Sequence, residues 1–178
     1  MRAKTVNEIP TFIELYNICP IEIKDILNKA KITPQTATWH PEAPNEIVPH
    51  NVYAHIKIVY NRAKKYGDLN LMLAAFFHDL GKTQVTTKHH SIPDKWSAKM
   101  HEHVSARLVE KYRDWIESLG GDFDIVYYIV KEHMRAKQLN HMRPVKQEAI
   151  CQHKYYDLLH QFTKLDDMKT PYLNEFNE

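Results

Sequence analysis

An all-α fold is the prediction for this chain of 178 residues, and three features of the sequence support it. Apolar residues recur at helical spacing over most of the chain. No segment shows a convincing alternation of apolar and polar residues, as a half-buried strand would. A total of 4 glycines is also low for a fold rich in strands and turns. We therefore expect a bundle of about six or seven helices without strands.

Each helix is expected where helical periodicity meets a start or stop signal. Pro10 and Pro20 suit the first turns of two short amphipathic helices, over 10–19 and 20–29, and the prolines within 31–49 indicate a loop. A helix is then expected from about His50 to Gly67, followed by a buried helix over 69–79 that Asp68 caps and Gly81 stops, and by a polar loop over 83–95. After this loop we expect a long amphipathic helix over 97–119, ended by Gly120 and Gly121. The last three expected elements are a helix from Asp122 to about Arg135, a short helix from Pro144 and a helix over 155–169.

Composition is that of an ordinary globular domain, with 43% hydrophobic and 26% charged residues. The formal charge of +2 gives no strong electrostatic preference for nucleic acid. The first ten residues lack the apolar core of a signal peptide, and no apolar run reaches the roughly 18 residues of a membrane span. The 2 cysteines, Cys19 and Cys151, are far apart and fit reduced thiols. A cytoplasmic protein without a membrane partner is the expectation.

Histidine and aspartate residues form the candidate functional set. The chain has 12 histidines, and an adjacent pair, His78-Asp79, ends an apolar run and is followed by Leu-Gly-Lys. The other candidates are His55, His101, His133 and the pair Asp166-Asp167. Imidazole and carboxylate together suit divalent ions such as manganese, iron, cobalt or nickel.

Helical phase tests whether these side chains face the core. His78 lies four residues after Ala74, and His133 lies four residues after Ile129, so both share a face with apolar residues. His101 has small residues on its own face, whereas His103 shares its phase with charged residues and is expected to face solvent. Phase is less clear for His55.

The final aspartates are separated by the same test. Asp166 lies four residues after Phe162, and Asp167 lies four residues after Thr163, so phase favours Asp166 as the inward residue. A single histidine on an apolar face is more often a hydrogen-bonded core residue than a metal ligand. Several buried histidines and carboxylates together would be very costly without a cation among them. The sequence therefore predicts a metal site.

These residues resemble the HD superfamily of metal-dependent phosphohydrolases. The strongest local likeness is Leu-Ala-Ala-Phe-Phe-His-Asp-Leu-Gly-Lys, which ends at Lys82. Trp39-His40-Pro41-Glu42, the segment from His101 to Ala106, and Lys131-Glu132-His133-Met134 resemble the HD domain attached to some bacterial CCA-adding tRNA nucleotidyltransferases. The likeness covers about 39–167 and includes nothing like a nucleotidyltransferase signature, so the tRNA-maturation role does not carry over.

The resemblance implies an HD domain over 39–178, and we expect residues 1–38 to form a helical extension packed on it. It also implies that His55, His78, Asp79 and the late aspartate (Asp166 by phase) hold one divalent ion, and that Asp79 bridges to a second ion held by His101 and His133. Manganese, iron, cobalt, nickel or magnesium would serve.

A mononuclear site without His101 and His133 is the alternative, and His50 competes with His55 as the first ligand. Asp79 and Lys82 are the expected catalytic residues, with Lys82 contacting a phosphate oxygen or remaining solvated.

The implied activity is hydrolysis of phosphomonoester or phosphodiester bonds in a nucleotide or a 2',3'-cyclic phosphate, with an RNA end and a homodimer as further options. The alternatives are a dNTP triphosphohydrolase, a cyclic-dinucleotide hydrolase, and a non-catalytic module that senses a nucleotide or binds a protein. Three further features could bind substrate: 88–90, for which a solvated loop is an equal alternative, Trp39, and the cluster of Arg135, Lys137 and Arg143. For the cluster a solvated surface is favoured, and for Trp39 a place in the core.

Overall fold

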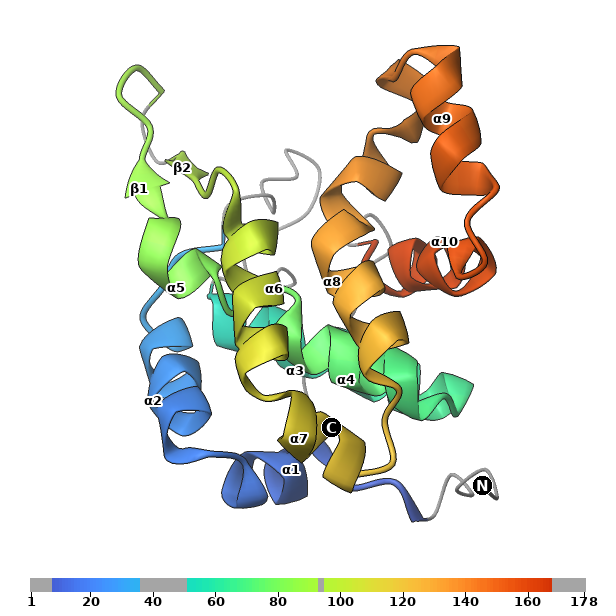
Figure 1. Ribbon diagram of the computed structural model, residues 1–178. Helices are drawn as coiled ribbons and strands as arrows, with labels where there is room; N and C mark the ends of the chain where they lie inside the picture. Colours follow the sequence, from blue (N-terminus) through green and yellow to red (C-terminus); the bar gives the residue numbers. More distant parts are fainter. Residues whose placement is uncertain (1–7, 36–50, 93–94, 168–178) are drawn as a thin grey trace.

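The computed structural model describes residues 8–35, 51–92 and 95–167, and these form an almost entirely helical bundle (Figure 1). This confirms the all-α prediction. The elements in chain order are α1 (Phe12–Ile18), α2 (Ile21–Ala30), α3 (Val52–Tyr66), α4 (Leu69–Phe77), α5 (Lys82–Val85), β1 (Thr87–Lys88), β2 (Trp96–Ser97), α6 (His101–Lys111), α7 (Arg113–Ser118), α8 (Phe123–Lys137), a 3₁₀ turn η2 (Leu139–His141), α9 (Pro144–Cys151) and α10 (Tyr156–Leu165).

Helix α4 lies at the centre of the bundle and contacts α3, α6, α8 and α10. Every residue from Leu71 to Phe77 is buried, as its continuous apolar sequence predicts. Local signals fix where α3 ends and α4 begins. Gly67 ends α3 in the left-handed conformation with a φ of 90°, and the side chain of Asp68 then accepts a hydrogen bond from the backbone N–H of Leu71. The C-terminal end of α4 therefore lies deep in the protein.

Helices α1 and α2 contribute to the same apolar core as the rest of the chain. Phe12 and Leu27 are buried in it, and the ring of Phe12 contacts the rings of Tyr53, Tyr60 and Phe76. The hydroxyl of Tyr60 in α3 donates a 2.7 Å hydrogen bond to the carbonyl of Pro10. The division of the chain at residue 38 stays a prediction, because residues 36–50 lie outside the described part.

The region after α4 differs from the prediction in three details. Gly81 does not end the helical structure, because the short helix α5 follows it directly. The loop expected over 83–95 contains β1, which pairs antiparallel with β2, so the expectation of no strand was wrong. The helix expected over 97–119 begins only at His101, after Met100 with a positive φ of 63°, and Tyr112 then divides it into α6 and α7 because its backbone departs from helical geometry.

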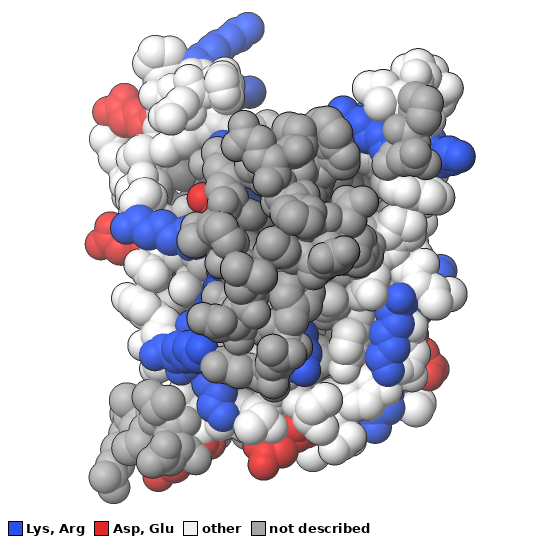
Figure 2. All heavy atoms as spheres, turned by 180° about the vertical axis from the view of Figure 1, so that it is seen from behind, with Lys and Arg blue, Asp and Glu red and all other residues white. Residues whose placement is uncertain are grey.

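The surface carries charges of both signs. In the view of Figure 2, Lys and Arg side chains and Asp and Glu side chains are both visible on the described part of the face. Both cysteines are free, Cys19 in the core and Cys151 at the surface. Among the described residues, no helix has the length and apolar character needed to cross a membrane.

Candidate metal centre

Four histidines and two aspartates from five helices or their ends meet in the interior. His55 comes from the second turn of α3, and the pair His78-Asp79 follows α4 directly. His101 is the first residue of α6, His133 lies near the end of α8, and Asp166 caps the C-terminal end of α10. All six side chains are buried, with residue exposures of 3% or less. Segments more than a hundred residues apart in sequence therefore supply one polar cluster.

The cluster divides into two groups whose ligand atoms lie close enough to hold a metal ion: His55, His78 and Asp166 in one, and Asp79, His101 and His133 in the other. In the first group, Nε2 of His55 lies 3.1 Å from Nε2 of His78 and 3.0 Å from Oδ1 of Asp166. In the second, Nε2 of His101 lies 3.3 Å from Nε2 of His133 and 3.0 Å from Oδ1 of Asp79.

The carboxylate of Asp79 lies between the two groups. Its Oδ1 faces His101 and His133, and its Oδ2 lies 3.2 Å from Nε2 of His55 and 3.4 Å from Nε2 of His78. One oxygen is thus directed to each group. This is the geometry of a carboxylate that can bridge two cations.

Three of the histidines are oriented by the backbone of their own segments. Nδ1 of His78 lies 2.7 Å from the carbonyl of Ala75, and His101 and His133 make the same contact with the carbonyl three residues earlier. A carbonyl can only accept, so Nδ1 is the donor in each case. In the neutral rings, Nε2 then carries a lone pair directed toward the centre of the cluster, as a metal ligand requires.

The resulting arrangement places acceptors against acceptors. The Nε2 lone pairs of His101 and His133 face each other and Oδ1 of Asp79, while Oδ1 of Asp166 is buried without a hydrogen bond. Buried acceptors without donors are costly, and a cation among them removes the cost. The nitrogen and oxygen atoms that meet in this cluster therefore fit a divalent metal ion as its ligands.

Electrostatics favour the ionisation states that bind a metal. Burial opposes the charge of Asp79, but His78, Lys82 and the neighbouring imidazoles of His101 and His133 hold its pKa well below the usual range. Burial lowers the pKa of His133 to about 4, so its ring is neutral at neutral pH. The pKa of Asp166 is also held low, against its burial, by Lys137 and by His78.

Each aspartate also contacts a lysine. Nζ of Lys82 lies 2.8 Å from Oδ2 of Asp79 and donates a 2.9 Å hydrogen bond to Oε1 of Gln35, and Lys82 is almost fully buried. Nζ of Lys137 lies 2.5 Å from Oδ2 of Asp166. Burial opposes the charge of Lys137, but Asp166 and Asp79 raise its pKa. The two lysines therefore balance the two carboxylates.

Arg62 of α3 fixes the backbone on both sides of Asp166. Its Nη1 donates hydrogen bonds of 2.8 Å to the carbonyl of Leu165 and 2.9 Å to the carbonyl of Asp167. These carbonyls belong to the C-terminal end of α10, where a cation is favourable. Arg62 thereby ties the end of α10 to the helix that carries His55.

All six predicted ligand positions thus come together, and the neighbouring candidates do not join them. Asp167 is exposed, and His103 has a side chain that is 41% exposed. His50 and Trp39 lie outside the described residues. Sequence reasoning did not assign Arg62 to the site and favoured a solvated surface for Lys137. The spacing of Lys137, four residues after His133 on one helix, was the available signal for its position.

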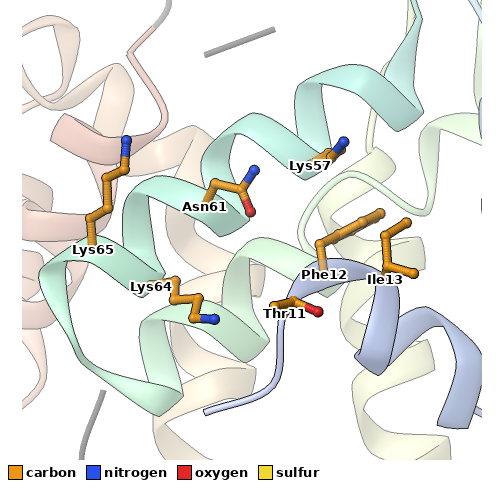
Figure 3. Close-up of a pocket in the computed structure, with 7 residues that line it drawn as sticks. All are labelled: Thr11, Phe12, Ile13, Lys57, Asn61, Lys64 and Lys65. Carbon is orange, nitrogen blue, oxygen red and sulfur yellow. The ribbon is translucent and has the colours of Figure 1, made fainter. Parts of the chain in front are cut away.

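A separate pocket of about 320 Å³ lies between α1 and α3 (Figure 3). It is lined by Thr11, Phe12, Ile13, Lys57, Asn61, Lys64 and Lys65. Its part of α3 faces away from the side that carries His55, and none of the six clustered residues is among those that line it. This pocket and the metal-type chemistry are therefore at different places in the described structure, and the chemistry identifies the candidate site.

Comparisons with known proteins agree with this geometry. A family model described as HD domain matches residues 52–157, which includes His55, the His78-Asp79 pair, His101 and His133. The chain is also similar to a Multifunctional CCA protein of Vibrio campbellii, with 30% identity over 113 residues. That alignment covers 62% of this chain and 25% of the relative, so the chain spans about a quarter of the length of that protein.

Proposed function

The chain belongs to the HD-domain family, whose members are generally metal-dependent hydrolases, and we propose that it hydrolyses a phosphate ester at the His-Asp cluster. The observation that carries the proposal is the position of Asp79, with one carboxylate oxygen toward each histidine group. A protein that only binds nucleotides has no need of a carboxylate placed between two sets of metal ligands.

The proposed ligands are the six clustered residues. His55, His78 and Asp166 would hold one divalent ion, and His101 and His133 would hold a second, with the carboxylate of Asp79 placed between the two groups. Manganese, iron, cobalt, nickel and magnesium are the candidate ions, because imidazole with carboxylate accepts several of them. A single ion in the first group together with Asp79 is the mononuclear form of the same proposal.

When bound, divalent ions supply acidity to water near neutral pH and positive charge beside the phosphoryl oxygens. Water would then attack phosphorus in line, so that a new P–O bond forms as the bond to the leaving group breaks, and the departing alcohol, nucleoside or phosphate would take up the proton that the water loses. The chain contributes fixed positions and fixed charges. Carbonyl contacts orient three imidazoles, the lysine partners keep Asp79 and Asp166 ionised, and the low pKa of His133 keeps its ring available as a ligand.

Lys82 has two proposed roles. Its contact with Oδ2 of Asp79 supports a positioning role, because the ammonium is buried between that carboxylate and Gln35. Direct contact with a phosphate oxygen would require the ammonium to leave these partners, and it stays a prediction. In either role Lys82 increases the positive potential where the developing charge of the phosphoryl group must be stabilised.

The proposed substrate is a nucleotide, a 2',3'-cyclic phosphate or another phosphorylated small molecule. The test is hydrolysis of p-nitrophenyl phosphate, bis-p-nitrophenyl phosphate, 2',3'-cyclic AMP, 2'-AMP, a dNTP and a cyclic dinucleotide, without metal and with each candidate ion. A variant with His78→Ala and Asp79→Ala is the control. Metal-dependent turnover that the variant lacks supports the proposal, and the product distinguishes a nucleotidase, a triphosphohydrolase and a diesterase. Nucleotide binding by the metal-loaded protein without any turnover would instead favour a sensing module.

A further inference from the structure

The two lysines of the metal centre differ in how firmly they are held. Lys82 contacts both Asp79 and Gln35, and its side chain is 6% exposed. Lys137 contacts Oδ2 of Asp166, and its side chain is 37% exposed. Lys137 is the last residue of α8, one helical turn beyond His133. This end of α8 lies at the same end of the bundle as the start of α6, whose first residue is His101 (Figure 1). Lys137 is thus both part of the buried cluster and in contact with solvent.

A metal ion in the first group would change what holds Lys137 in place. Oδ1 of Asp166 faces His55 and His78, and Oδ2 of the same carboxylate holds the lysine. A divalent cation beside this carboxylate would repel an ammonium on its other oxygen and would compete with it for the carboxylate charge. The partly exposed side chain of Lys137 can then move its ammonium toward solvent.

The other cations of α8 are engaged elsewhere. Arg135 contacts Glu132 at 2.9 Å, and Lys131 lies over the ring of Tyr127 with its Nζ 5.4 Å from the centroid. Within the described part of α8, Lys137 is therefore the cation placed against a predicted metal ligand.

Charge balance indicates which phosphate such a site prefers. The two clustered aspartates carry two negative charges and their two lysine partners carry two positive ones, so the six proposed ligands and these lysines together have no net negative charge. The positive charge of bound metal must then be offset by water-derived hydroxide and by the substrate. A terminal phosphate carries about two negative charges near neutral pH, whereas a phosphodiester carries one. The terminal phosphate therefore gains more in this site.

We propose that Lys137 is a substrate-binding residue that favours a terminal phosphate over a phosphodiester. This inference rests on the proposed function. Its ammonium leaves Asp166 when metal binds and contacts a phosphate oxygen that a diester would carry as an ester link. Charge-assisted hydrogen bonds of this kind are the strong ones in phosphate recognition.

The test compares the wild type with Lys137→Met and Lys137→Arg, each loaded with Mn²⁺. Lys131→Met on the same helix is the matched control. Metal content is measured first, then the affinity for inorganic phosphate by calorimetry, then kcat and KM for p-nitrophenyl phosphate and bis-p-nitrophenyl phosphate. We expect Lys137→Met to retain its metal, to bind phosphate about tenfold or more weakly, and to lose about tenfold or more in kcat/KM for the monoester. We expect a loss of about threefold or less for the diester, and partial recovery in Lys137→Arg.

Other outcomes would overturn the inference in distinguishable ways. Equal losses for both esters with unchanged phosphate affinity would contradict a role in substrate choice. Loss of bound metal in both Lys137 variants would mean that Lys137 only positions Asp166. A metal-loaded wild type that binds no phosphate would also exclude the inference. Phosphate binding that depends on Lys137, without turnover of any ester, would support Lys137 as an anion-binding residue while the proposed hydrolase activity fails.

Discussion

Gly81 lies directly against the backbone of His101, so closely that a Cβ atom on Gly81 would be 2.2 Å from the His101 carbonyl oxygen. The N–H of Gly81 also donates a 2.9 Å hydrogen bond to the hydroxyl of Ser105. This close contact joins the segment after α4, which carries the His78-Asp79 pair, to the first turn of α6. It brings Asp79 within reach of His101.

Gly81→Ala is expected to damage both stability and metal binding. The methyl group must push α6 away from the end of α4, and overpacking of this kind costs about 1–3 kcal/mol. Because the displaced turn carries His101, we expect weaker binding of metal to the second histidine group. Gly67→Ala is the matched control, since its positive φ makes alanine costly by about 1–2 kcal/mol far from the cluster. Urea unfolding and metal titration of both variants separate the two effects. Unchanged metal binding in Gly81→Ala would contradict this prediction.

Arg62→Met is expected to weaken metal binding through the position of Asp166. The variant loses the donors that fix the carbonyls of Leu165 and Asp167, so the end of α10 becomes free to shift. Loss of such supporting contacts lowers metal affinity by about 10- to 100-fold in known sites. Lys64→Met, on the outer side of the same helix, is expected to bind metal as the wild type does. Calorimetric titration with Mn²⁺ measures both, and equal affinities in the two variants would show that Arg62 has no influence on the ligand.

The N-terminal helices are expected to be indispensable for the fold. Phe12→Ala should destabilise the protein by about 3–5 kcal/mol, because its ring is buried against Tyr60 and Phe76. Ile13→Ala, at the next position, should change stability by about 0.5 kcal/mol or less, because Ile13 is 49% exposed. Denaturant unfolding of the two variants gives the comparison. A small effect of Phe12→Ala would mean that α1 is an appendage rather than part of the core.

The sequence predicted most of the helices and the inward side of His78, His101, His133 and Asp166, because both depend on periodicity. The buried helix α4 has an unbroken apolar sequence, and its cap at Asp68 and the stop of the preceding helix at Gly67 are local signals. Helical phase also separates Asp166 from Asp167, since neighbouring residues on a helix point about 100° apart. The structure places Asp166 in the cluster and Asp167 at the surface.

Contacts between distant segments were beyond this reasoning. Arg62 and Leu165 are 103 positions apart, and nothing in either local sequence indicates that one donates to the other. The division of α6 from α7 at Tyr112 also has no glycine or proline to predict it. The hydroxyl of Tyr112 and the ammonium of Lys111 both contact Glu22 of α2, which is a tertiary interaction at the point of the break.

The central claim is that two groups of ligands, joined by Asp79, hold divalent metal. Its most direct test is the metal-to-protein ratio of the purified chain after loading with Mn²⁺ or Fe²⁺, measured by elemental analysis for the wild type and for Asp79→Asn. Asparagine keeps the shape of Asp79 but removes the charge and one acceptor oxygen. The account predicts about two ions per chain in the wild type and a clear loss in the variant, because a bridging carboxylate serves both ions. A wild type that binds no ion under any loading condition, or an Asp79→Asn variant with an unchanged ratio and affinity, would contradict it.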